Sequence, residues 1–201
     1  MEVVNGVFFD FGAEYADRRS IADLELEQWS TELFGSGNTP REFTDFKEAI
    51  LTFKLRWVPG QKFYTEPYRK VIVGSIWPVF ELEYRKAIPG ISGSIINYDY
   101  LELHASDEMR LGTMGISRWS VNLGSFLQQK NIRFTDYRFF RGSDNFFFAN
   151  PLRNFQNLDT TLSTTYPFVQ VNYLHDFGSA LSNKLPLLKR TPLQFAGGGG
   201  I

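Results

Sequence analysis

Apolar and polar residues alternate with a period of two along several long segments of this chain. Between residues 44 and 58, every second residue from Ala49 to Trp57 is apolar, and the residues between them are polar apart from Ile50. A helix would mix the two sets around its surface, whereas a β-strand places them on opposite faces. The pattern predicts seven strands, over residues 3–18, 44–58, 76–88, 95–111, 115–128, 161–176 and 191–201.

The expected strands are long. Several run to about 12–15 residues, whereas strands of globular proteins are usually about 5–6 residues long. With a rise of about 3.3 Å per residue and a tilt near 45°, roughly ten residues cross the apolar band of an outer membrane. Uncharged stretches such as residues 71–80 are shorter than the roughly 20 apolar residues of a transmembrane helix. Strand length and alternation therefore predict an all-β fold, namely an antiparallel transmembrane β-barrel. The predicted location is the cell outer membrane of a Gram-negative-type bacterium.

One strand face is expected to contact lipid, and its aromatic residues are expected to form the interfacial belts of such a barrel. These residues are Phe9, Phe11, Tyr15, Phe53, Trp57, Phe80, Tyr84, Trp119 and Tyr173. Within 95–111 the pattern is less regular, because Tyr98 and Tyr100 fall on the polar face. Either these two tyrosines point inward near a rim, or a bulge shifts the phase of the strand.

Single-chain bacterial barrels close with an even number of strands, and seven is odd. The N-terminal residues also lack the pattern of a signal peptide. We therefore expect residues 1–201 to be one partial barrel domain, a fragment of a longer barrel. Its long external loops are predicted at 19–43 and 129–160, with a connection at 59–75 on the opposite, periplasmic side.

Composition and spacing exclude several functions. Lys plus Arg (21) and Asp plus Glu (22) nearly cancel, which argues against nucleic acid as a partner. There is no cysteine, and His104 and His175 lie far apart without acidic residues at ligand spacing, so no metal site is expected. No nucleophile elbow is present, and the tetraglycine at 197–200 lacks the context of a phosphate loop. The sequence predicts neither an enzyme nor a cofactor.

Several motifs in order resemble a known family. They are the run VPGQKFYTEPYRKVIVGSIWPVFELEYRKAIPG at 58–90, followed by YDYLEL, LGTMGISRW, FFRGSDNFFF and FQNLDTTLSTTYPFVQVNYLHDF. They resemble the C-terminal barrel of a large outer-membrane family whose members carry an N-terminal carboxypeptidase-regulatory-like domain and whose barrel is formally of unknown function. The resemblance implies outer-membrane lipid as a partner, and contacts to polypeptides or periplasmic factors through the N-terminal part.

A second resemblance lies within the loop at 129–160. Phe140-Arg141-Gly142 is similar to the Val-Arg-Gly-Tyr/Phe motif of the BamA/TamA-type barrels, which insert or translocate polypeptides. Here Phe140 replaces the usual branched residue and Ser143 the usual aromatic one. The resemblance implies a loop folded into the lumen, where Arg141 pairs with an acidic residue. The candidate partners are Asp10, Glu14, Glu48, Glu81 and Glu83.

Three functions stay open from the sequence. The first is polypeptide insertion or translocation, with the motif loop packed in the lumen. The second is a pore, receptor or surface anchor, in which Arg141 lies in a solvated loop without a lumen partner. The third is a soluble β-sandwich or lipocalin-like carrier, which needs shorter strands than these. The aromatic residues and arginines of the loop at 129–160 have two interpretations. They bind a partner or a glycan, or they form a core that holds the loop together, and we favour the second interpretation. These residues are Phe146, Phe147, Phe148, Phe155, Arg133, Arg138, Arg141 and Arg153.

Overall fold

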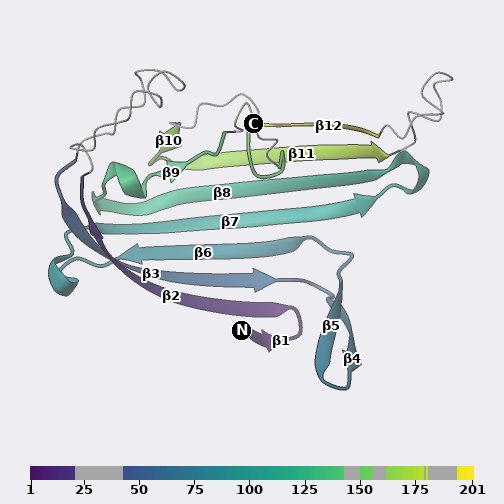
Figure 1. Ribbon diagram of the computed structural model, residues 1–201, viewed down its shortest axis with the longest axis horizontal. Coiled ribbons are helices and arrows are strands. Elements are labelled where there is room, and N and C mark those ends of the chain that lie inside the picture. The colour runs from purple at the N-terminus through teal and green to yellow at the C-terminus, as the bar shows by residue number, and fades with distance from the viewer. Residues whose placement is uncertain (21–42, 143–149, 156–161, 179, 181–193) are drawn as a thin grey trace, which may run out of the picture.

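The computed structural model describes residues 1–20, 43–142, 150–155, 162–178, 180 and 194–201 (Figure 1). These residues contain twelve strands, three short 3₁₀ turns and no α-helix. The strands are β1 (Glu2–Val4), β2 (Val7–Arg18), β3 (Phe46–Trp57), β4 (Lys62–Glu66), β5 (Arg69–Gly74), β6 (Val79–Ala87), β7 (Asn97–Arg110), β8 (Ile116–Asn131), β9 (Arg138–Phe139), β10 (Ser163–Thr164), β11 (Phe168–Gly178) and β12 (Phe195–Gly200). The 3₁₀ turns are η2 (Ile91–Gly93), η3 (Gly112–Met114) and η4 (Phe134–Asp136). None of the helical turns in this part of the chain is long or apolar enough to span a membrane.

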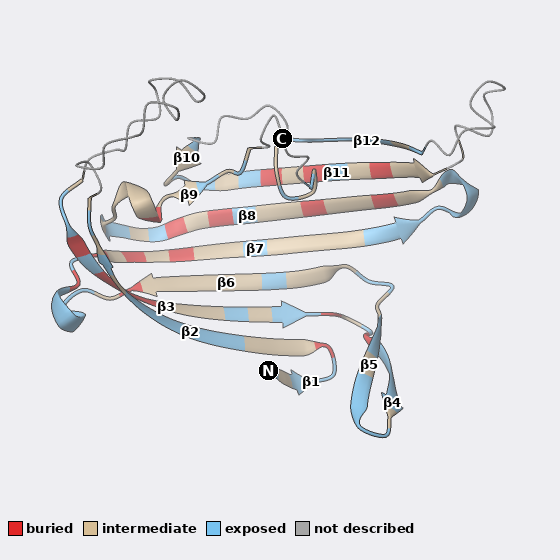
Figure 2. Ribbon diagram, viewed as in Figure 1, coloured by how far each residue is buried: buried red, intermediate tan, exposed pale blue. Residues whose placement is uncertain are grey.

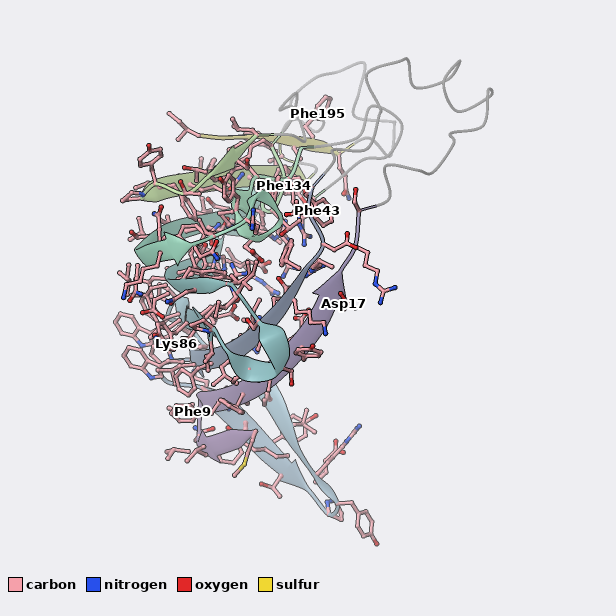
Figure 3. The ribbon with its side chains drawn as sticks, turned by 90° about the vertical axis from the view of Figure 1, so that its left-hand side faces the viewer. Phe9, Asp17, Phe43, Lys86, Phe134 and Phe195 are labelled. Atoms are coloured by element: carbon pink, nitrogen blue, oxygen red, sulfur yellow. The ribbon has the colours of Figure 1, made fainter. Side chains whose placement is uncertain are left out.

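Eight strands form one large sheet in the order β1-β2-β3-β6-β7-β8-β11-β12. Every neighbouring pair in it is antiparallel. The expectation of an all-β, antiparallel fold is therefore confirmed. Among the described strands, β1 and β12 are the two edges and do not pair with each other, so the sheet is an open arc and not a closed barrel (Figures 1 and 3).

Each of the seven expected ranges overlaps a strand of this sheet, and the eighth strand arises from a tight turn. Gly6 adopts a left-handed φ of 82°, which glycine tolerates. This turn folds β1 back onto β2, with Glu2 opposite Phe8. The expected connection at 59–75 contains a hairpin of its own, β4–β5, which extends away from the large sheet (Figure 1). Of the expected loop at 19–43, residues 21–42 lie outside the described residues.

Strand register separates the side chains into two faces. One row consists of Phe9, Leu55, Leu82, Leu103, Leu123 and Val169, each opposite the next on neighbouring strands. The adjacent row on the other face consists of Phe8, Arg56, Glu81, His104, Asn122 and Gln170. Figure 3 shows Phe9 on the convex side of the arc, with Phe43 and Phe134 on the concave side. The polar rows therefore line the concave face.

A small apolar core occupies one end of the concave face, where β3 and β7 begin (Figure 2). Its buried residues are Phe46, Ile50, Ala87, Ile96, Tyr98, Tyr100 and Phe126, against which Phe43, Ile132 and Phe168 pack. The Phe126 ring centroid lies 5.7 Å from that of Tyr98 and 4.7 Å from that of Tyr100. Both tyrosines thus point inward, and the β7–β8 register also shifts beside each of them. Both explanations of the irregular pattern in 95–111 therefore apply.

Candidate functional site: the concave face and the loop that covers it

The concave face is lined by ion pairs that run across strands. The Arg56 guanidinium lies 3.2 Å from the Glu81 carboxylate on the neighbouring strand. Glu83 forms ion pairs with two cations, Lys54 at 3.0 Å and Arg85 of its own strand at 3.2 Å. The two cross-strand pairs follow directly from the antiparallel register, which places Arg56 opposite Glu81 and Lys54 opposite Glu83.

Part of the loop between β8 and β11 reaches back onto this face through Arg138. Its Nη2 donates to Glu102 Oε1 at 2.9 Å, and the Tyr100 hydroxyl donates to the other oxygen of Glu102 at 2.6 Å. The Arg138 guanidinium also lies over the Phe168 ring, 5.6 Å from its centroid. The side chains of Arg138 and Glu102 are only 25% and 15% exposed, respectively. A charge-assisted pair of this kind is stronger than a solvated surface pair because less water competes with it.

A second segment of the loop, residues 150–155, is anchored to the same face. Ser120 Oγ donates to the Leu152 carbonyl at 2.9 Å, and Asn172 Nδ2 donates to the Pro151 carbonyl at 3.2 Å. Ser120 and Asn172 are both buried. Because the loop carbonyls are the acceptors for these buried donors, the loop lies inside the arc and satisfies polar groups that the sheet alone would leave unpaired.

The motif Phe140-Arg141-Gly142 lies between these two anchors. The Phe140 ring packs edge-on against Phe168, with centroids 5.2 Å apart, and against Phe155 at 6.1 Å. The Phe155 N–H donates to the Arg141 carbonyl at 2.9 Å, and Gly142 forms a parallel bridge with Phe155. A Cβ added at Gly200 of β12 would lie 3.1 Å from two Phe155 ring atoms, so this glycine leaves room for the loop. The described aromatic residues of the loop thus form an internal core, while Phe146, Phe147 and Phe148 lie outside the described residues.

Arg141 itself is exposed and lines a cavity of about 820 Å³ on the concave face. Three of its five candidate partners, Asp10, Glu81 and Glu83, line the same cavity, whereas Glu14 and Glu48 do not. No ion pair joins Arg141 to any described residue. Glu81 and Glu83 are paired with the cations above. The structure therefore brings the motif arginine near the expected acids without pairing it.

Two buried carboxyl groups face each other at the apolar end of the arc. Glu48 is fully buried and Asp136 of η4 is 5% exposed. Arg18 Nη2 lies 2.6 Å from Glu48 Oε1, while Glu48 Oε2 and Asp136 Oδ2 form no hydrogen bond. Burial, followed by the negative charge of Glu48, raises the pKa of Asp136 to about 7. Asp136 therefore holds a proton at pH values below about 7 in the folded protein.

The convex face carries the aromatic residues that the sequence assigned to lipid contact. Phe11, Tyr15, Trp57 and Tyr173 are exposed, with Phe11 the most exposed at 69%. The others are half-buried, and two ring pairs, Phe9–Phe53 and Trp57–Phe80, each have centroids 5.6 Å apart. These others are Phe9, Phe53, Phe80, Tyr84 and Trp119. Leucines and valines between them, such as Leu127 and Val169, are also exposed.

Residues 1–201 match a family model described as "Family of unknown function (DUF5686) C-terminal domain". The chain belongs to this family. No curated protein and no solved structure matches it significantly. This membership confirms one part of the first resemblance, namely that the chain is a C-terminal domain of unknown function. The N-terminal regulatory-like domain and the relationship to BamA/TamA-type barrels stay predictions.

Sequence reasoning named Arg138 only as one of four loop arginines, and it missed Glu102, the carboxylate with which Arg138 pairs in this DUF5686 domain. Glu102 had a usable signal, because it alternates in phase with His104 on the polar face of its strand. Arg138 had none, since the alternation stops at the end of β8. Within the described residues, no group of three or more His, Asp or Glu side chains is arranged to hold a metal ion.

Proposed function

We propose that this chain forms part of the wall of an outer-membrane β-barrel, with its convex face toward lipid. The observation that carries the proposal is the contrast between the two faces. Phe11, Leu103, Leu123, Leu127 and Val169 are all more than a third exposed on the convex face. The charged rows and the loop lie on the concave face. In water this arrangement would expose a wide apolar surface. In a bilayer the apolar convex face would contact lipid, and the charged concave face would contact water in the lumen.

The free edges of the sheet fit the same proposal. In lipid, an unpaired strand edge leaves backbone groups without partners, at a cost of several kcal/mol each. Further strands pairing with β1 and β12 would close the arc and remove these edges. The cavity would then lie in the lumen of the completed barrel.

Within this barrel, the loop packed on the concave face supports polypeptide insertion or translocation of the BamA/TamA type. That function requires a loop held inside the lumen, and Arg138, Ser120 and Asn172 supply such anchors here. One observation favours the second candidate, a pore, receptor or surface anchor. Arg141, the arginine of the motif, has no carboxylate partner among the described residues.

The experiment exchanges the charges of the loop anchor in the full-length protein, using Arg138→Glu, Glu102→Arg and the double exchange. Each single change leaves like charges facing each other in a partly buried place, and we expect a loss of about 1.5–3 kcal/mol of stability or more. Heat-modifiable gel mobility reports barrel folding, and the amounts of other outer-membrane proteins report insertion activity. Arg110→Glu is the control, since Arg110 lies at the strand end and is exposed.

Insertion function predicts that both readouts fall with the single changes and recover in the double exchange. If folding falls while the other outer-membrane proteins stay at wild-type levels, the pore, receptor or anchor function replaces it. If the wild-type protein shows no heat-modifiable band and is extracted from membranes by alkaline carbonate, the barrel proposal itself is wrong.

A further inference from the structure

The cavity on the concave face carries more positive than negative side chains. Six cationic side chains line it: Lys54, Arg56, Arg85, Arg138, Arg141 and Arg153. Four carboxylates line it: Asp10, Glu81, Glu83 and Glu102. The chain as a whole has a net charge of −1, so this surplus is a local property of the cavity.

Two of the six cations have no ion-pair partner among the described residues. Four of the cations are joined to carboxylates of the cavity, through the Arg56–Glu81, Lys54–Glu83, Arg85–Glu83 and Arg138–Glu102 pairs. Arg141 and Arg153 form no ion pair with any described residue, and both are exposed. Asp10 is the remaining carboxylate, and it lies on β2, separated from β8 by β3, β6 and β7.

Arg141 and Arg153 both come from the loop between β8 and β11, and both line the cavity. The hydrogen bond from the Phe155 N–H to the Arg141 carbonyl holds the two loop segments together, two residues beyond Arg153. The cavity is also lined by the polar side chains His104, Asn122 and Gln170, which occupy one row of the register. Two guanidinium groups therefore line the cavity beside further hydrogen-bonding groups, and neither has an ion-pair partner among the described residues.

We propose that Arg141 and Arg153 form a binding site for a phosphate-bearing ligand in the concave cavity. A phosphate monoester carries about −1.5 to −2 charges at neutral pH, which matches two arginines that have no ion-pair partner among the described residues. Each planar guanidinium can donate two parallel hydrogen bonds to phosphate oxygens. The ligand is a soluble phosphate ester or the phosphate of a lipid headgroup. The site depends on the cavity alone and not on polypeptide insertion, so the two proposals can fail separately.

The test is isothermal titration calorimetry on the full-length protein in neutral detergent micelles. Inorganic pyrophosphate is the soluble probe, and dihexanoyl phosphatidic acid is the lipid probe. We compare the wild type with Arg141→Gln/Arg153→Gln. The matched control is Arg69→Gln/Arg110→Gln, which removes two exposed arginines that do not line the cavity. All four arginines are exposed, and heat-modifiable gel mobility verifies that each variant folds.

We expect the wild type to bind at least one probe, more weakly as salt is raised. The cavity variant should bind about tenfold or more weakly, with the control unchanged. Binding of pyrophosphate assigns a soluble ligand, and binding of phosphatidic acid alone assigns a lipid headgroup. The proposal is overturned if the wild type binds neither probe. It is also overturned if the control loses as much affinity as the cavity variant, because the attraction would then be diffuse.

Discussion

Replacing Asp136 by asparagine should remove a pH dependence of stability that the buried carboxyl pair produces. Asp136 lies in η4, outside the strands of the sheet, and faces Glu48 on β3. The neighbouring charged or titratable groups are Arg18 and Glu14 on β2, Tyr98 on β7, and Arg133 just before η4, whose backbone donates to the Asp136 side chain. Asparagine keeps the shape of the side chain and cannot lose a proton.

The sign follows from the raised pKa. An aspartate in the unfolded chain titrates near pH 3.9, whereas burial raises the pKa of Asp136 to about 7 in the folded protein. Between these two values the folded protein holds a proton that the unfolded chain has lost. The stabilisation is therefore complete below about pH 4 and is lost as the pH rises through 7, at about 1.4 kcal/mol per pH unit. Between pH 5 and pH 8 the loss amounts to about 2–3 kcal/mol.

The assay is urea unfolding in detergent micelles at pH 5 and pH 8, followed by tryptophan fluorescence. Between pH 5 and pH 8, the free energy of unfolding should fall by about 2–3 kcal/mol more in the wild type than in Asp136→Asn. This difference corresponds to a shift of about 1 M in the urea midpoint. Asp10→Asn, a change at an exposed carboxylate, should behave as the wild type. Equal pH dependence in the wild type and in Asp136→Asn, within about 0.5 kcal/mol, would refute the raised pKa of Asp136.

Two further predictions concern packing. Gly200→Val should displace the loop, because its Cβ would lie 2.5 Å from Asn172 Nδ2 and 3.1 Å from the Phe155 ring. Limited proteolysis of the loop should then be faster than in Gly199→Val, where a Cβ meets nothing within 4 Å; equal rates would argue against this packing. Phe126→Ala should lower the free energy of unfolding by about 3–5 kcal/mol, since Phe126 fills the core between Tyr98 and Tyr100. Leu127→Ala, at a side chain that is 62% exposed, should cost about 1 kcal/mol or less, and an equal cost at both positions would contradict the location of the core.

Strands β2, β3, β6, β8 and β11 of the large sheet were predictable because each has one polar and one apolar face. β3 at Phe46–Trp57 lies inside the range expected from alternation, and its register with β6 pairs charge with charge. The β4–β5 hairpin gave no such signal. Its apolar residues, including Phe63, Tyr64 and Ile72, occupy consecutive positions and are exposed on both faces, so no period of two appears.

The candidate site was less predictable, because it depends on how a loop folds over a sheet. Tyr98 and Tyr100 interrupt the alternation of their strand because they are buried in the core with Phe126. Phe126 lies on another strand, so no local sequence pattern reveals this contact. In the same way, sequence alone offered four arginines in the loop and no means of choosing among them. In the structure, Arg138, two residues after η4, is the arginine that pairs with Glu102.

Arg138 and Arg141 lie three positions apart in this loop but differ in burial and pairing. This difference allows the loop anchor and the phosphate site to be tested separately. Arg138 is mostly buried and paired, so reversing its charge leaves Glu102 facing a like charge and should damage folding. Arg141 is exposed and unpaired among the described residues, so reversing its charge removes no contact that holds the fold together. Arg141→Glu should therefore fold normally and lose only phosphate binding. If Arg141→Glu instead damaged folding as Arg138→Glu does, Arg141 would have a structural partner, and its assignment to a ligand site would be wrong.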